Sequence, residues 1–243
     1  MQTKPSTLKS IQVGHKHFLF NTAYFTTATS NIFCGHYWKE KDAITGHETG
    51  RGTTWFLRHE GHHLVLRHYL RGGLMSKLSR DNYIYTRLKN CRSISEFNIL
   101  SQLNDLGLPV PTPVAAQVIQ HGATYTADLL TQRIPNAQDL VQVLQSSKNH
   151  IFYQKLGQII ALFHQHGVCH ADLNIQNILQ DTDNKFWLID FDRAQRKKNK
   201  PTWQHANLKR LKRSFEKEKV RHGIKWELAD WDILIDAYRQ AMT

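Results

Sequence analysis

The sequence predicts an α+β protein with a small, β-rich N-terminal lobe and a larger, mainly helical C-terminal lobe. Three observations support this prediction. Four short β-prone runs, bounded by turn residues, lie between residues 53 and 131. A single stretch of helical periodicity interrupts them. Beyond residue 134, apolar residues recur at intervals of three and four, which is typical of amphipathic helices.

The N-terminal lobe is expected to form an antiparallel sheet with one inserted helix. Four β-prone runs pair as two hairpins across Gly-containing turns: Thr53–Arg58, Leu64–Tyr69, Val114–Ile119 and Tyr125–Thr131. The inserted helix runs from Ser93 to Leu106, with its apolar residues on one face, and stops at Gly107. The first 50 residues are polar with scattered aromatic side chains, and their pattern assigns no elements.

The C-terminal lobe is expected to contain three helices and a pair of short strands. In chain order these are the helix Phe152–Phe163, the strands Ile178–Leu179 and Phe186–Ile189, and the helices Ala206–Val220 and Glu227–Met242. The boundary between the lobes is placed at Ile134, because the following Pro135 disfavours helix at that residue. The predicted domains are therefore residues 1–133 and 134–243.

The composition excludes several classes of protein. With 40% hydrophobic and 10% aromatic residues, the 243-residue chain has enough apolar side chain for a packed core, unlike a disordered protein. Its longest apolar stretch, Ile159–Phe163, is far too short to cross a bilayer, and the N-terminus lacks the apolar region of a secretory signal. Three cysteines without C-x-x-C spacing argue against disulfides and structural zinc. We therefore expect the protein to stay in the cytosol.

The positive charge is concentrated in one segment. Of the formal net charge of +12, the 33 residues from Arg193 to Lys225 carry +11, because they contain 13 lysines and arginines but only two glutamates. Such a segment favours an anionic partner, since its like charges repel one another. Its apolar residues fall on one predicted helical stripe, which consists of Leu208, Leu211, Phe215 and Val220.

The most informative motif is the run His170-Ala171-Asp172-Leu173-Asn174-Ile175-Gln176-Asn177, followed 18 residues after Asp172 by Asp190-Phe191-Asp192. Phosphoryl transfer needs a carboxylate that orients the attacking hydroxyl, and it needs oxygen ligands for Mg²⁺. We expect Asp172 to orient the attacking hydroxyl, and Asn177 and Asp190 to bind Mg²⁺. His170 and Asp192 are expected to support them. This ordered pair of motifs resembles the catalytic and metal-binding loops of the protein kinase-like superfamily, which implies a two-lobed protein kinase-like fold.

The residues that precede this motif in the chain fit an ATP site, except that an arginine replaces the superfamily's lysine. Gly50-Arg51-Gly52-Thr53 precedes the first predicted strand, where a glycine loop would approach the phosphates. On the next strand, Arg67 stands where that superfamily has a lysine, and a guanidinium is not interchangeable with an ammonium group. Glu96 has two interpretations: an ion pair with Arg67, which we favour, or a capping box with Ser93.

The acceptor is expected not to be a protein. Ala171 replaces the arginine of H-R-D and Asp192 replaces the glycine of D-F-G, while the basic segment leaves no room for an activation segment. Further runs narrow the resemblance: Gly50–Thr54, Leu66–Tyr69, Arg71–Leu74, Lys77–Leu78, Glu96–Phe97, Gly107–Pro111, Ala137–Leu140, His170–Leu179, Asp190–Asp192, Asn207–Leu208 and Arg210–Glu218. Through them the chain from about Gly50 onward is similar to the Gram-negative 3-deoxy-D-manno-octulosonic acid (Kdo) kinases, which are related to the lipopolysaccharide core heptose kinases.

This resemblance implies ATP-dependent phosphorylation of the 4-hydroxyl of Kdo on a lipid A precursor, by a peripheral protein at the cytoplasmic side of the inner membrane. Arg67 in place of lysine belongs to the family's pattern. The basic helix would then contact an anionic membrane surface or the acceptor through Lys209, Arg210, Lys212 and Arg213. Arg71 would be a second phosphate contact. The alternative for the basic helix is that its lysines and arginines are merely solvated. The alternative for Arg71 is that it belongs to a plain turn.

Two other functions stay open at this point. A heptose kinase or another small-molecule kinase, such as one that modifies antibiotics, would have the same catalytic motifs. A basic nucleic-acid-binding protein is a third hypothesis, but the sequence contains no RRM, KH or helix-turn-helix pattern, so we expect no nucleic-acid partner. No pattern indicates the oligomeric state.

Overall fold

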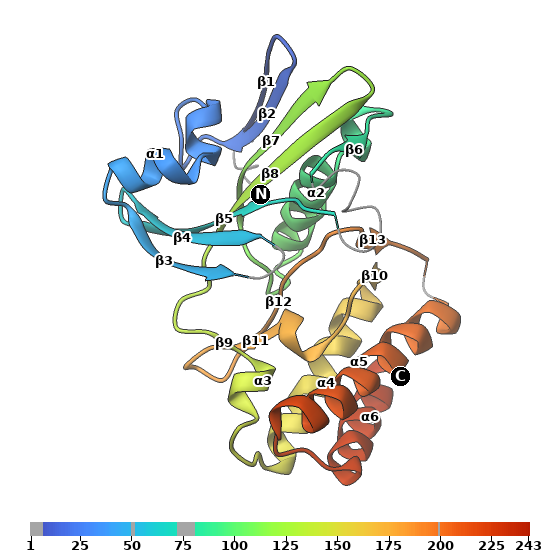
Figure 1. Cartoon of the computed structure of the whole chain (residues 1–243). Coiled ribbons are helices and arrows are strands. Elements are labelled where there is room, and N and C mark those ends of the chain that lie inside the picture. The colour runs from blue at the N-terminus through green and yellow to red at the C-terminus, as the bar shows by residue number, and fades with distance from the viewer. Residues whose placement is uncertain (1–6, 50–51, 72–80, 199) are drawn as a thin grey trace, which may run out of the picture. The chain divides into compact units, whose positions relative to one another are not determined.

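The structure is a computed structural model that describes residues 7–49, 52–71, 81–198 and 200–243. The chain forms two compact units. Unit 1 comprises residues 1–104 and 111–133, and unit 2 comprises residues 105–110 and 134–243. The predicted α+β class is confirmed, because unit 1 is built on an antiparallel sheet and unit 2 is mainly helical (Figure 1).

Unit 1 is built around a sheet with the strand order β1-β2-β7-β8-β5-β4-β3, and β6 pairs with β8. The strands are β1 (Leu8–Val13), β2 (Lys16–Asn21), β3 (Ile44–Thr49), β4 (Thr53–His59), β5 (His62–His68), β6 (Tyr83–Ile84), β7 (Pro113–His121) and β8 (Thr124–Gln132). The helices are α1 (Gly35–Glu40), α2 (Arg92–Asp105) and the 3₁₀ turns η1 (Ser30–Phe33) and η3 (Leu88–Asn90). The predicted hairpins and inserted helix are confirmed as β4–β5, β7–β8 and α2.

The N-terminal segment, to which the pattern assigned no elements, widens this sheet. Strands β1 and β2 extend it beside β7, and β3 extends it beside β4. Aromatic side chains of the segment, including Phe18, Phe20 and Trp38, pack with Leu64 and Leu66 of β5 in one buried core. Burial of these scattered aromatic residues therefore depends on contacts with distant strands, which no local periodicity predicts.

Alternation along β5 separates the core from the candidate site. Successive side chains of a strand point to opposite faces of the sheet. Leu64 and Leu66 lie in the core that the N-terminal segment completes. Arg67, the next residue, points to the other face and pairs with Glu96 of α2. One short strand thus stabilises unit 1 and presents a cation on its opposite side.

Unit 2 contains the predicted helices and short strands. The helices are α3 (Leu140–Val143), α4 (His150–Gln165), α5 (Pro201–His222), α6 (Leu228–Met242) and the 3₁₀ turn η4 (Ile175–Asn177). The strands are β9 (Gln138–Asp139), β10 (Val168–Cys169), β11 (Ile178–Gln180), β12 (Phe186–Leu188) and β13 (Gln195–Arg196). Helix α5 begins at Pro201, earlier than predicted, because proline suits the first turn of a helix.

The predicted apolar stripe of α5 is wrong at one position. Leu208, Leu211 and Phe215 are buried, whereas Val220 is 88% exposed. Five residues of α-helix turn the chain by about 140° from Phe215. Val220 therefore lies away from the buried face, on the same side of α5 as Lys209 and Arg213.

Candidate active site

The candidate catalytic loop lies in unit 2 between β10 and β11. It begins at His170, passes through Asp172 and ends in the 3₁₀ turn η4. Asn174 caps this turn, because its Oδ1 accepts the backbone N–H groups of Gln176 and Asn177 at 2.8 and 3.2 Å. The cap fixes the backbone between the candidate base and the candidate metal ligand.

His170 connects this loop to the end of β12. Its buried ring donates from Nε2 to the Ile189 carbonyl oxygen at 3.0 Å and accepts the Asp172 backbone N–H at Nδ1, at 3.2 Å. A ring that donates from one nitrogen and accepts at the other is neutral. Burial lowers the pKa of His170, which favours the same form. His170 therefore holds Asp172 in a fixed relation to the residue that precedes Asp190.

Asp172 and Asn177 are linked within the loop. The Asp172 side chain is 60% exposed, and its Oδ1 lies 3.7 Å from Nη1 of Arg210 on α5. Asn177 donates from Nδ2 to the Asp172 carbonyl oxygen at 2.9 Å. This bond uses the nitrogen of the amide, and the amide oxygen of Asn177 accepts no hydrogen bond within the described part of the chain. The loop thus offers an exposed carboxylate and an amide oxygen.

Asp190 follows β12 in an uncommon backbone conformation. Its φ is +61°, in the left-handed region, and Arg193 three residues later has a φ of +60°. For residues other than glycine this region costs about 1–3 kcal/mol, and such strain clusters at functional sites. Both Asp190 and Asp192 are partly exposed. The turn after β12 therefore holds a strained conformation, and both of its aspartates remain partly exposed.

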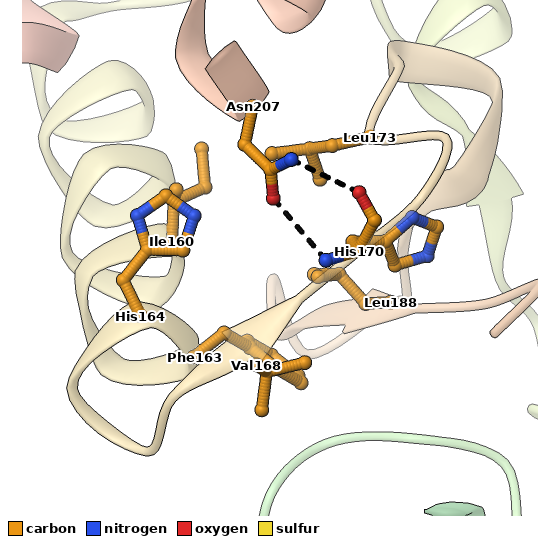
Figure 2. A pocket seen from close by; sticks show the side chains of 8 residues that line it. All are labelled: Ile160, Phe163, His164, Val168, His170, Leu173, Leu188 and Asn207. Carbon is orange, nitrogen blue, oxygen red and sulfur yellow. Dashed lines mark hydrogen bonds between the residues drawn. The ribbon is translucent and has the colours of Figure 1, made fainter. Parts of the chain in front are cut away.

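Helix α5 holds the candidate catalytic loop at two points, and Figure 2 shows the first of them, at Asn207. Asn207 accepts the His170 N–H at Oδ1, at 3.2 Å, and donates from Nδ2 to the His170 carbonyl oxygen at 3.0 Å. Two turns later, the Ser214 hydroxyl oxygen accepts the Ile175 N–H at 3.1 Å. Asn207 and Ser214 belong to runs that carry the family resemblance, but nothing in the sequence signalled their contact with the loop.

A small, mostly apolar pocket lies behind the loop. Figure 2 shows its lining side chains, which are Ile160, Phe163, His164, Val168, His170, Leu173, Leu188 and Asn207. The exposed carboxylate of Asp172 is not part of this lining. The pocket belongs to the packing that supports the loop and not to the surface where chemistry would occur.

In unit 1, Glu96 is the centre of a buried polar cluster. Its side chain is 3% exposed, and its Oε2 accepts hydrogen bonds from Nη2 of Arg67 and from the Tyr69 hydroxyl, both at 2.5 Å. Burial and the Glu96 carboxylate raise the pKa of Tyr69, so its hydroxyl stays a donor. Ser93 donates instead to the Gln117 carbonyl oxygen at 2.8 Å. The predicted Arg67–Glu96 ion pair is confirmed, and the capping box is wrong.

The predicted glycine loop is only partly described. Gly50 and Arg51 lie outside the described residues. Gly52 is the first described residue after them, and Thr53 begins β4, where it pairs with Thr49 of β3. The role of this loop toward phosphates therefore stays a prediction.

Arg71 packs on an aromatic ring instead of standing free. Its guanidinium carbon lies 5.2 Å from the centre of the Tyr83 ring, and the side chain is half-buried. The glycines that follow it, Gly72 and Gly73, lie outside the described residues. The phosphate contact at Arg71 thus stays a prediction.

The four basic residues of α5 predicted to contact substrate or membrane do not form one surface. Arg210 lies beside Asp172. Lys212 has its Nζ 5.9 Å from the centre of the Trp231 ring of α6. Lys209 and Arg213 are exposed and pair with no acidic side chain among the described residues. We call Lys209 and Arg213 the outward basic face.

Within residues 7–49, 52–71, 81–198 and 200–243, no helix has the length and apolar character needed to cross a bilayer. In the same residues, no group of three or more His, Cys, Asp or Glu side chains is arranged to hold a metal ion. A Mg²⁺ ion held by one carboxylate, one amide oxygen and nucleotide phosphates would need no such group, because Mg²⁺ keeps several water and phosphate ligands.

The sequence is similar to known kinases over most of its length. The model of the family described as "Lipopolysaccharide kinase (Kdo/WaaP) family" matches residues 35–238, so the likeness begins at α1, ahead of Gly50. A 3-deoxy-D-manno-octulosonic acid kinase of Vibrio parahaemolyticus serotype O3:K6 is 46% identical over 207 residues, which are 85% of this chain and 87% of that protein. A kinase of the same name from Haemophilus influenzae (strain 86-028NP) is 40% identical over 242 residues, 96% and 100% of the two chains.

Proposed function

The chain belongs to the lipopolysaccharide kinase (Kdo/WaaP) family, and we propose that it phosphorylates the 4-hydroxyl of Kdo on a lipid A precursor, with ATP as donor. The observation that supports this most is the extent of the likeness: 40–46% identity to proteins named as Kdo kinases covers 85–96% of this chain. That extent includes residues of both units. The shared name also favours Kdo over heptose as the acceptor.

We assign Asp172 to the acceptor hydroxyl. Its exposed carboxylate can accept a hydrogen bond from the hydroxyl, orient its oxygen toward the γ-phosphorus and take the proton as the new bond forms. Two hydrogen bonds hold the backbone of Asp172: its N–H donates to the His170 ring, and its carbonyl oxygen accepts from the Asn177 side chain. A base held in this way needs little reorganisation to reach the reactive geometry.

Asn177 and Asp190 fit the ligand preferences of Mg²⁺. The nitrogen of the Asn177 amide is used by the Asp172 carbonyl oxygen, so the amide oxygen is the atom left for a cation. Asp190 adds a carboxylate, and Asp192 supports it. Hard oxygen ligands suit Mg²⁺, which would neutralise charge on the β- and γ-phosphates of bound ATP.

We assign Arg67 of unit 1 to the phosphates of ATP, together with the loop of Gly50, Arg51, Gly52 and Thr53. Glu96 and Tyr69 orient the Arg67 guanidinium from the buried side, while 27% of the arginine side chain remains exposed. An arginine is permanently charged and presents its donors in a fixed plane, which suits bidentate contact with phosphate oxygens. Glu96 acts here as the residue that positions Arg67.

The outward basic face is assigned to the anionic cytoplasmic surface of the inner membrane, where the protein would bind peripherally. A lipid A precursor is anchored in a bilayer, so its kinase has to work at that surface. Each cation near an anionic membrane contributes about 1 kcal/mol. Val220 lies on the same side of α5 and is 88% exposed, so it can add an apolar contact.

An acceptor panel tests the proposed activity. Purified protein, Mg²⁺ and labelled ATP would be incubated with a Kdo-bearing lipid A precursor, a heptose-containing core, an aminoglycoside or no acceptor. We expect label only on the Kdo lipid, at its 4-position. Labelling of the heptose core alone would overturn the acceptor assignment. Steeply salt-dependent binding to oligonucleotides without ATP turnover would overturn the kinase itself.

Vesicle sedimentation tests the membrane contact. The double variant Lys209→Ala/Arg213→Ala should lose most of its binding to vesicles that contain anionic lipid, while its affinity for Mg-ATP stays unchanged. A matched control, Lys155→Ala/Arg239→Ala, removes the same charge from exposed positions on α4 and α6. Equal vesicle binding by the two variants would contradict a membrane role for the outward basic face.

A further inference from the structure

The candidate catalytic loop lacks a cation of its own. Residues 170–177 include no lysine or arginine, and the hydrogen bonds of His170 keep its ring neutral. Phosphoryl transfer nevertheless places a negatively charged group beside the Asp172 carboxylate. Without a nearby positive charge, these two negative groups would repel each other. Mg²⁺ held by Asn177 and Asp190 would offset charge on the phosphates, whereas the charge of the Asp172 carboxylate itself calls for a cation from another element.

Arg210 of α5 is a cation that the structure brings to that position. Its Nη1 lies 3.7 Å from Oδ1 of Asp172, and the two side chains are 45% and 60% exposed. Both groups can thus reach a bound substrate. A guanidinium has five donors in one plane, so it can contact the carboxylate with one edge and phosphoryl oxygens with another.

The hydrogen bonds of α5 fix the place of Arg210. Asn207, three residues before it, binds the backbone of His170, and Ser214, four residues after it, binds the backbone of Ile175. An exposed ion pair is usually worth little, because two long side chains must be ordered to form it. Here the backbone of α5 is attached to the loop on both sides of Arg210, so the proximity to Asp172 follows from the fold.

We infer that Arg210 is a catalytic residue that contacts the phosphoryl group during transfer, an inference that rests on the proposed kinase activity. In this step the bond between the γ-phosphorus and the bridging oxygen breaks, and its electron pair leaves with ADP. The acceptor oxygen bonds to the γ-phosphorus, and the hydroxyl proton passes to Asp172. Arg210 offsets the negative charge of the phosphoryl oxygens and keeps the carboxylate oriented. Its role thus differs from that of the outward basic face.

Kinetics and nucleotide binding of Arg210→Ala and Arg210→Lys test this role. The first readout is phosphorylation of the Kdo lipid. The second is the gain in Mg-ADP affinity when aluminium fluoride, a mimic of the transferring phosphoryl group, is added. We expect Arg210→Ala to lower kcat by about 100-fold or more, to keep the KM for ATP within about threefold of wild type, and to abolish the aluminium fluoride gain.

Arg210→Lys should recover only part of the activity, because an ammonium keeps the charge without the planar geometry. The matched control is Arg239→Ala, which removes an exposed arginine that lies 3.3 Å from Asp236 on α6. This variant should behave as wild type in both readouts. If Arg210→Ala unfolds at assay temperature, Arg210→Lys carries the same comparison.

Several results would overturn the inference and leave the kinase function intact. These are a kcat of Arg210→Ala within about threefold of wild type, a defect confined to the KM for the lipid, or an unchanged aluminium fluoride gain. The absence of any such gain in wild type would also overturn it. Because the nucleotide measurement needs no acceptor, it decides the role of Arg210 even if wild type phosphorylates none of the acceptors, the result that would overturn the proposed function.

Discussion

Asn207 of α5 is bonded twice to the backbone of His170: it accepts the N–H at 3.2 Å and donates to the carbonyl oxygen at 3.0 Å. The asparagine is 5% exposed, so both bonds are shielded from water. The helix that contributes much of the positive charge therefore also supports the candidate catalytic loop.

Replacing Asn207 by aspartate tests this support. The variant keeps an acceptor for the His170 N–H, but it places a carboxylate oxygen against the His170 carbonyl oxygen. We expect the free energy of unfolding to fall by about 2 kcal/mol and kcat to fall by about 10- to 100-fold. Calorimetric affinity for Mg-ATP should hardly change. Ser214→Ala, which removes the acceptor of the Ile175 N–H, should have a smaller effect in the same direction. Wild-type kinetics in Asn207→Asp would contradict a positioning role.

Asp172→Asn tests the assigned base. The substitution conserves the shape of the side chain and the backbone bonds of the loop, but it removes the proton acceptor. We expect transfer from labelled ATP to fall by about 10³-fold, with Mg-ATP binding retained. Asp183→Asn, in the exposed turn between β11 and β12, serves as the control and should be fully active. An active Asp172→Asn would mean that another group accepts the proton.

Glu96→Gln tests the cluster that orients Arg67. Loss of the buried carboxylate removes its ion pair with the arginine and weakens the hydrogen bond with Tyr69. We expect the KM for ATP to rise about 10-fold and the free energy of unfolding to fall by about 2–3 kcal/mol. Tyr69→Phe removes only the hydroxyl that donates to Glu96, so it should lower the free energy of unfolding by about 1 kcal/mol. An unchanged KM in Glu96→Gln would separate this cluster from nucleotide binding.

Gly157→Ala tests the packing of α4 against α6. A Cβ atom at this position would lie 2.2 Å from the carbonyl oxygen of Leu234, so the two helices would have to move apart. Overpacking of this kind costs about 1–3 kcal/mol, and backbone atoms yield less easily than side chains. We therefore expect a loss of at least about 2 kcal/mol in denaturant unfolding. Gln158→Ala, the exposed neighbour, should change stability by less than about 0.5 kcal/mol.

The stability of unit 2 is expected to fall in acid because of His164. Burial lowers its pKa to about 4, and its Nδ1 lies 2.9 Å from the Tyr238 hydroxyl. In the unfolded chain the ordinary pKa is about 6.5, so below that pH the unfolded state binds the proton first. The contribution of neutral His164 to the free energy of unfolding is complete above about pH 6.5 and is lost as the pH falls toward 4.

Denaturant unfolding at pH 7 and pH 4.5 measures this effect. The difference due to His164 should be about 2–3 kcal/mol, and the lowered pKa of His170 adds to it in the same direction. His164→Gln should reduce the difference between the two pH values. A pH dependence identical to that of wild type would assign the acid sensitivity to other groups.

Local pattern was sufficient for the elements that carry the candidate site. The hairpin of β4 and β5, helix α2, and the strands β11 and β12 follow from apolar spacing and turn residues within short windows. Asp172 and Asn177 are five residues apart, and Asp190 follows directly after an apolar strand. Such signals need no knowledge of the rest of the chain. The family resemblance drew on the same local runs.

Other features could not be predicted because they depend on which surfaces meet. The scattered aromatic residues before position 40 are buried because β2 and α1 pack with β5 in one core. Whether Glu96 caps α2 or pairs with Arg67 was settled by the strand that packs beside it. Val220 looked like the end of an apolar stripe, but it lies outside the buried face of α5.

The sequence by itself determined the chemical inventory of this protein: a carboxylate, an amide and a second carboxylate in loops of fixed spacing, and a basic helix behind them. Only the tertiary structure decided which basic residue meets the chemistry. Asn207 and His170 are 37 positions apart, and their contact brings Arg210 to Asp172 while Lys209 and Arg213 face outward. Neighbouring residues of a helix point in different directions, so their partners are chosen by the docking of α5 against the loop and not by their order in the chain.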